Sequence, residues 1–296
     1  MTHSSDNRLQ QSSKRCVIAL HGSLGSGRQW TRLAEQLGGG YHVMAPDISG
    51  YGSNPAGPLL PTTLVEEVAR LGDQIDRAAG AIHLVGHSYG GAIAFKMATA
   101  SPYAGRIRSL TLIEPILPTL LRENIPDRRL HDLFAKLGND ISHDLWNGLH
   151  MEALDKFLQF WNGSGPGERL SDPVRLRMIQ QMEKVAFDFT AVLGERDVGA
   201  AASGLRVPTL LYSGGLSPYL TQRIVGRLAS MIPGAQAKHL PAAGHMLPLS
   251  HAGIINPDIA RHIMRADDLA AVSLASPPDV GGENWTAQRE LPLMPR

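Results

Sequence analysis

The chain has 296 residues, of which 43% are hydrophobic and 19% charged, a composition typical of a globular protein with a sizeable core. Its 28 basic and 27 acidic residues leave a net charge of +1 and lie scattered along the chain. This balance excludes the charge signature of a nucleic-acid-binding protein and of a protein that docks on anionic membranes.

The single cysteine, Cys16, excludes an internal disulfide. The first residues are polar and lack the apolar segment of a secretory signal. No apolar stretch approaches the ~18 residues of a membrane-spanning helix. We therefore expect a cytoplasmic protein.

Six short segments rich in Val, Ile and Leu predict β-strands, and helical patterns such as residues 62–79 lie between them. The strands do not alternate cleanly between apolar and polar residues, which is typical of parallel strands covered on both faces. The sequence thus predicts an α/β fold with a doubly wound, mostly parallel sheet. The expected strands are residues 16–21, 41–46, 81–86, 108–114, 207–213 and 235–240.

The gap between the fourth and fifth strands holds three amphipathic helical stripes instead of one. We expect the second stripe to begin at Ser142 as N-cap, and the third at Ser171, which is followed by Asp172 and Pro173. The expected organisation has five parts: a flexible arm (1–15), a core in two pieces (16–115 and 206–265), a helical insertion (116–205) and a flexible tail (266–296).

The third strand runs into the pentapeptide Gly86-His87-Ser88-Tyr89-Gly90, and a helical segment follows at once. Glycines on both sides of Ser88 allow strand and helix to approach closely, so that the hydroxyl stands out at the sheet edge on a strained backbone. The helix N-terminus also directs its amides toward negative charge that develops nearby. This strand–turn–helix context predicts that Ser88 is a nucleophile.

Four motifs follow one another in the order His-Gly, Asp-x-x-Gly-x-Gly, Gly-x-Ser-x-Gly and Gly-His. They begin at His21, Asp47, Gly86 and Gly244. In this order, over about residues 16–264, the chain resembles the α/β-hydrolase superfamily. The resemblance implies that the helical insertion is a cap, or lid, over the active site.

The resemblance also implies the groups that work with Ser88. His245 follows the last strand in a Gly-His loop and would be the general base of a catalytic triad. The oxyanion hole would use the backbone N–H groups of Ser23 and Tyr89.

The acid departs from the family pattern, because Ser217 stands where most relatives carry aspartate, and no Asp or Glu occurs from residue 198 to 257. Glu114 ends the fourth strand, where a carboxylate faces the ligand crevice of a parallel sheet. Some members of the superfamily, including haloalkane dehalogenases, place their acid on that strand. We therefore expect Glu114 to complete the triad. Two readings compete: Glu114 as a purely structural carboxylate, and Asp197 as a weaker rival acid.

The expected function is that of an esterase, a serine hydrolase that cleaves a carboxylic ester or lactone through an acyl-Ser88 intermediate, with no metal and no organic cofactor. The expected partner is a largely apolar small-molecule substrate, with no nucleic acid and no membrane. Hydrolysis of a carbon–carbon bond or cofactor-free perhydrolysis could use the same groups. A ligand receptor with little turnover is the alternative outside enzymes. The sequence leaves the substrate and the oligomeric state open.

Overall fold

The computed structural model describes residues 15–54, 62–78, 80–122, 124–163 and 170–275. Within these residues, six strands form one sheet in the order β2-β1-β3-β4-β5-β6, and every neighbouring pair is parallel. The strands are β1 (Arg15–Leu20), β2 (Tyr41–Met44), β3 (Ile82–His87), β4 (Ile107–Ile113), β5 (Thr209–Gly214) and β6 (Gln236–Leu240).

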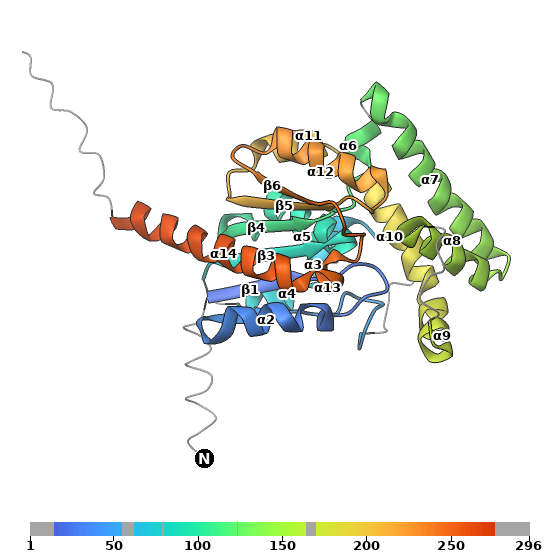
Figure 1. The fold of residues 1–296 in the computed structure, drawn as a ribbon, viewed down its shortest axis with the longest axis horizontal. Coiled ribbons are helices and arrows are strands. Elements are labelled where there is room, and N and C mark those ends of the chain that lie inside the picture. The colour runs from blue at the N-terminus through green and yellow to red at the C-terminus, as the bar shows by residue number, and fades with distance from the viewer. Residues whose placement is uncertain (1–14, 55–61, 79, 123, 164–169, 276–296) are drawn as a thin grey trace, which may run out of the picture.

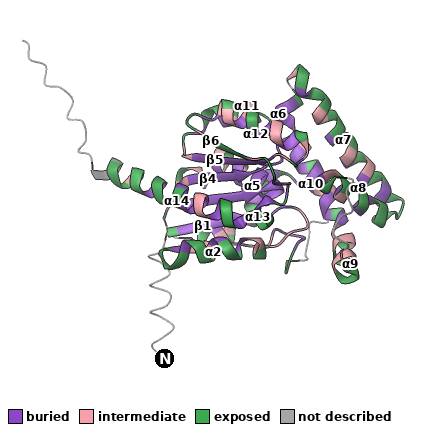
Figure 2. Cartoon of the chain, viewed as in Figure 1, coloured by how far each residue is buried: buried purple, intermediate pink, exposed green. Residues whose placement is uncertain are grey.

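Helices cover both faces of this sheet (Figure 1), because successive strand residues point in opposite directions. In β1, Val17 and Ala19 join the core under α2 (Thr31–Leu37) and α14 (Ala252–Ala275). Ile18 and Leu20 join the core on the other face. The helices of that face are α3 (Leu64–Arg70), α4 (Gly72–Asp76), α5 (Ser88–Ala100), α11 (Val198–Gly204) and α12 (Tyr219–Met231). The doubly wound parallel fold is confirmed, and Figure 2 shows its buried strands.

The described part of the chain between β4 and β5 is mostly helical, and α7, α8 and α9 project beyond the end of the sheet (Figure 1). Its helices before α11 are α6 (Thr119–Arg122), α7 (Ile125–Trp146), α8 (His150–Asn162), α9 (Asp172–Gln180) and α10 (Met182–Gly194).

Of the two helix starts expected in this insertion, Ser171 is confirmed as the N-cap residue of α9, and Ser142 is wrong. Ser142 is not an N-cap, because it lies inside α7 and its hydroxyl donates to the carbonyl of Gly138 at 2.9 Å. The break comes instead near Gly148, whose φ of 75° ends the helical path. The third stripe is also divided, since α9 ends at Gln180 and α10 begins at Met182.

Other elements are short or differ at their ends. The expected helix 62–79 is divided at Leu71 into α3 and α4.

The last helix is longer than expected, because α14 continues to Ala275 and the expected boundary at 265 falls inside it. Asp267 holds this last part to the core by accepting a hydrogen bond from Tyr41 Oη at 2.8 Å. The arm before Arg15 and the tail after Ala275 lie outside the described residues. The short elements are η1 (Gly27–Trp30), η2 (Gly38–Gly40), η3 (Ala104–Arg106) and α13 (Leu247–Ser250).

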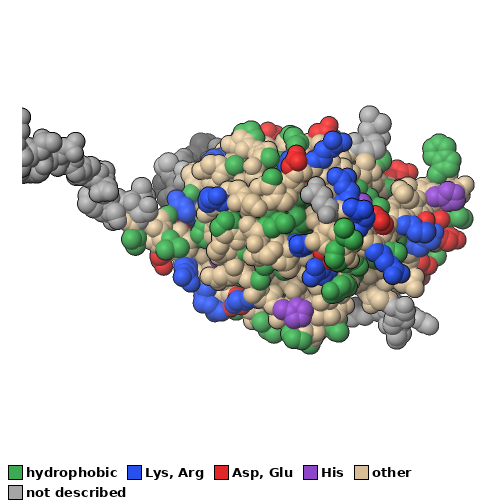
Figure 3. Space-filling view, turned by 90° about the horizontal axis from the view of Figure 1, so that it is seen from above, with side chains coloured by type: hydrophobic (Ala, Val, Ile, Leu, Met, Phe, Trp, Pro, Cys, Tyr) green, Lys and Arg blue, Asp and Glu red, His purple; other side chains and the backbone are tan. Residues whose placement is uncertain are grey.

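The surface mixes charged and apolar side chains. On the face drawn in Figure 3, hydrophobic side chains occur singly or in small groups among charged ones, as is normal for a protein surface. None of the described helices has both the length and the hydropathy needed to cross a membrane.

Candidate active site

The turn between β3 and α5 carries Ser88 on a strained backbone. Its φ of 55° lies in the left-handed region that non-glycine residues rarely adopt. A Cβ at Gly86 would lie 2.6 Å from the carbonyl oxygen of Gly90, and one at Gly90 would lie 2.3 Å from that of His21. Neither position can hold a side chain, which explains the glycines of the pentapeptide. The sharp turn leaves the Ser88 side chain at the carboxyl end of the sheet.

Ser88, His245 and Glu114 form one hydrogen-bonded row. His245 Nε2 lies 2.9 Å from Ser88 Oγ, and His245 Nδ1 lies 2.6 Å from Glu114 Oε2. The other carboxylate oxygen, Glu114 Oε1, accepts a hydrogen bond from the backbone N–H of Gly214 at 2.7 Å. Because a carboxylate only accepts, Nδ1 carries the ring proton and Nε2 is free to accept from the serine hydroxyl.

The acid position of this row is occupied by the side chain that follows β4. Glu114 is fully buried and adopts a φ of 45°, so its backbone is strained as that of Ser88 is. Asp197 is exposed at the start of α11. Ser217, at the place where the family's acid was expected, is a buried serine in the turn after β5. The structure brings Glu114 to His245 and leaves Asp197 outside the row.

A second histidine, His87, supports the loop that carries His245. His87 Nε2 donates to the backbone carbonyl of His245 at 2.9 Å, and the two rings lie 4.9 Å apart. Burial, and then the nearby His245, hold the pKa of His87 well below its usual range, so this ring is neutral. The sequence does not predict this contact of His87, because a residue beside Ser88 has no pattern that reveals a partner so distant in the chain.

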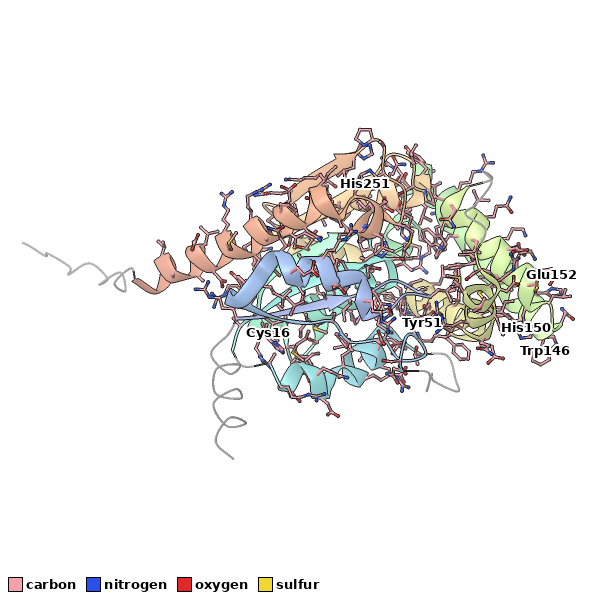
Figure 4. All side chains as sticks on the ribbon, turned by 60° about the horizontal axis from the view of Figure 1, so that its bottom comes forward. Cys16, Tyr51, Trp146, His150, Glu152 and His251 are labelled. Atoms are coloured by element: carbon pink, nitrogen blue, oxygen red, sulfur yellow. The ribbon has the colours of Figure 1, made fainter. Side chains whose placement is uncertain are left out.

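The insertion reaches this row through Trp161 of α8. Its indole stacks on the imidazole of His245, with ring centroids 4.0 Å apart and planes inclined by 19°. Phe134 and Phe157 pack around the indole. Trp146 of the same insertion lies elsewhere: its side chain is 90% exposed and points away at the far end of α7 (Figure 4).

A cavity of about 1100 Å³ opens over the row. Ser88, His245, Ser23 and Tyr89 all line it, so both residues expected to supply oxyanion amides border the same cavity as the serine. Apolar side chains of α7, α8, α9 and α10 form much of the remaining wall, among them Phe134, Phe157, Met178, Val185 and Phe189. Among the described residues, no three His, Cys, Asp or Glu side chains are grouped as a metal site.

Residues 17–256 match the model of the alpha/beta hydrolase family. The chain belongs to this family. A hydrolase is therefore the supported class of enzyme, and the arrangement of Ser88, His245 and Glu114 is the kind that nucleophilic hydrolysis needs.

Individual relatives are more distant. A segment of 100 residues is 36% identical to Lipase LipV of Mycobacterium tuberculosis, and it covers 33% of this chain and only 36% of that lipase. The pimeloyl-[acyl-carrier protein] methyl ester esterase of Chromobacterium violaceum is 26% identical over 250 residues, which cover 83% of this chain and 93% of the esterase. MenH from S. aureus superposes with a TM-score of 0.67 at 18% identity, covering 86% and 94% of the two chains, and this likeness shows the fold alone.

Proposed function

We propose that this hydrolase cleaves carboxylic esters through an acyl-enzyme on Ser88. The observation that carries the proposal is the hydrogen-bonded row from Ser88 through His245 to Glu114, which borders a mainly apolar cavity. Serine is a weak nucleophile unless a base takes its proton, and a base works best when a third group fixes its orientation. The row provides both conditions.

In the first half-reaction, Ser88 Oγ attacks the ester carbonyl carbon while His245 Nε2 takes the hydroxyl proton. The negative charge on the carbonyl oxygen is stabilised by the backbone N–H groups of Ser23 and Tyr89. Glu114 accepts from Nδ1–H and stabilises the imidazolium. The tetrahedral intermediate then collapses, and the alcohol leaves with the proton from His245.

In the second half-reaction, water attacks the acyl-Ser88 ester while His245 takes one of its protons. A second tetrahedral intermediate forms at the same amides. Its collapse releases the carboxylic acid and returns the proton to Ser88 Oγ. The cycle consumes one water and needs no other reactant.

The insertion serves in this proposal as a cap that shapes the acyl site. Aromatic and aliphatic side chains of α7, α8 and α10 line the cavity, and a wall of this kind favours an uncharged, bulky acyl or aryl group. The presence of a lipase and a methyl ester esterase among the relatives supports an ester as the bond that is cleaved.

The proposal is tested with p-nitrophenyl esters of increasing acyl length and a panel of lactones, for the wild type and Ser88→Ala. We expect turnover that peaks at a medium or long acyl chain, and loss of turnover by ~10⁴ or more in Ser88→Ala, because alanine fits the turn but supplies no nucleophile. Turnover of a diketone without turnover of any ester would favour carbon–carbon hydrolysis. Tight ligand binding with neither reaction would favour a receptor.

A further inference from the structure

A buried ionic cluster joins the insertion to the core. Lys184 of α10 contacts the carboxylate of Asp188 on the same helix, and its Nζ lies 2.8 Å from Glu67 Oε1 of α3. The side chains of all three are 5% exposed or less. Burial alone lowers the pKa of Lys184, but Asp188 and Glu67 outweigh it and raise that pKa, so the ammonium keeps its charge. Buried ion pairs contribute little net stability on their own, so stability alone does not account for this cluster.

Each carboxylate of the cluster also binds one of the two residues expected to form the oxyanion hole. Ser23 Oγ donates to Asp188 Oδ2 at 2.5 Å. Tyr89 Oη donates to Glu67 Oε1 at 3.0 Å, and Lys184 Nζ lies 4.6 Å from the centre of the Tyr89 ring. The same ammonium therefore holds two carboxylates, and these in turn hold the side chains of Ser23 and Tyr89.

We propose that Lys184, Asp188 and Glu67 form a clamp that positions both oxyanion-hole amides. The inference rests on the proposed function. Ser23 lies in the turn after β1, outside the strand ladder, where Gly25 N–H donates to the carbonyl of Gly22 at 3.1 Å, and the bond to Asp188 adds a side-chain support. Oxyanion donors act only when they lie ~2.7–3.1 Å from the developing charge, and an error of about 1 Å can cost ~10²-fold in rate. The insertion thus supplies positioning residues for the reaction as well as a wall of the cavity.

The clamp is tested by removing single hydroxyl groups, because loss of a charge from the buried cluster could prevent folding. Ser23→Ala and Tyr89→Phe each delete one bond to the cluster and leave the backbone amide in place. We expect kcat to fall about tenfold in each variant while KM changes less than about twofold, since the oxyanion exists only in the transition state. The rate of covalent labelling of Ser88 by a fluorophosphonate should fall in parallel.

Tyr51→Phe is the matched control. Tyr51 Oη donates to the same oxygen, Asp188 Oδ2, at 2.6 Å, and the ring is fully buried between the core and the insertion (Figure 4). Tyr51 supplies no oxyanion amide. The control should lose a similar amount of thermal stability and keep kcat and the labelling rate within about twofold of the wild type.

The clamp is contradicted if Ser23→Ala and Tyr89→Phe keep the wild-type labelling rate. It is also contradicted if Tyr51→Phe loses as much rate as they do, because the cluster would then serve stability alone. Labelling needs no ester turnover, so the two proposals fail separately. A wild type that is labelled but cleaves no ester or lactone would disprove ester hydrolysis and leave the clamp measurable.

Discussion

Among the residues that the structure describes, a second row of serine, histidine and carboxylate resembles the row of Ser88, His245 and Glu114 (the active row), but its residues do not line the cavity over Ser88. At the other row, Ser109 Oγ of β4 lies 2.8 Å from His83 Nδ1 of β3, and His83 Nε2 lies 3.3 Å from Asp267 Oδ1 of α14. Burial does not separate the rows: Ser109 is 0% exposed and Ser88 is 6% exposed.

The two rows differ in their position in the fold and in their backbone conformation. His83 and Ser109 face each other within the sheet, as register partners of β3 and β4. Ser88 and Glu114 instead follow the carboxyl ends of the same two strands, both at positive φ, which is the end where parallel sheets bind ligands. In the proposed mechanism, hydrogen bonding between the right residue types is therefore not enough to make a nucleophile. A strained turn beside a cavity is also needed.

The largest expected difference between the rows is in their acids. Glu114→Gln keeps the size of the side chain but removes the charge that stabilises the imidazolium, so kcat for a p-nitrophenyl ester should fall by ~10²–10⁴. Asp267→Asn should keep kcat per folded molecule within about twofold, as should the exposed control Asp197→Asn. A large loss of kcat in Asp197→Asn, together with a small loss in Glu114→Gln, would show that the acid is misassigned.

The next effect concerns the contact between the insertion and the active row. Trp161→Leu removes the ring stacked on His245 and reshapes the cavity, so relative rates across the acyl-length series should change by about tenfold. Trp146→Leu changes an exposed side chain of the same insertion and should leave the series unaltered. An unchanged profile in Trp161→Leu would mean that the indole is packing alone.

Ser109→Ala should leave ester turnover within about twofold of the wild type. It should lower the free energy of unfolding by about 1–2 kcal/mol, because His83 Nδ1 loses its buried partner. Chemical denaturation and the ester assay on the same preparation measure both quantities. Loss of ester turnover in a fully folded Ser109→Ala variant would contradict the distinction between the two rows.

The last effect is the acid sensitivity of the buried row, which is read out in stability alone. Burial lowers the pKa of His83 to about 4, although Asp267 opposes this; Arg108 and His262 add to the lowering. The unfolded chain takes up this proton near pH 6.5 and the folded chain only near pH 4, so stability is full above pH 6.5 and falls between these values. The loss is on the order of 2–3 kcal/mol. His83→Gln should show a smaller loss of Tm between pH 7 and pH 4.5, and an equal loss would refute the assignment.

Much of the active row could be predicted from the sequence because its signals are local. Each signal lies within a few residues of the side chain that it identifies. These signals are the glycines around Ser88, the Gly-His loop that contains His245 and the strand that precedes Glu114. The family resemblance placed the usual acid after the fifth strand, and the absence of carboxylates from 198 to 257 left Glu114, with Asp197 as a weaker rival. The parallel sheet followed from the apolar strands.

The contacts between distant elements could not be predicted in this way. Lys184 and Asp188 stand four residues apart and resemble an ordinary exposed helical pair. Glu67 gave a usable signal, because it lies three residues after Leu64 and four before Leu71, on the apolar stripe of its helix. A charge at such a position needs a buried partner, but only the tertiary structure identifies that partner as Lys184.

The most direct test of the central claim is to label the intact protein with a fluorophosphonate and map the adduct by peptide mass spectrometry. The account predicts one adduct, on Ser88, together with loss of ester turnover in proportion to labelling. An adduct on Ser109 or another serine, or full turnover after Ser88 is labelled, would contradict it.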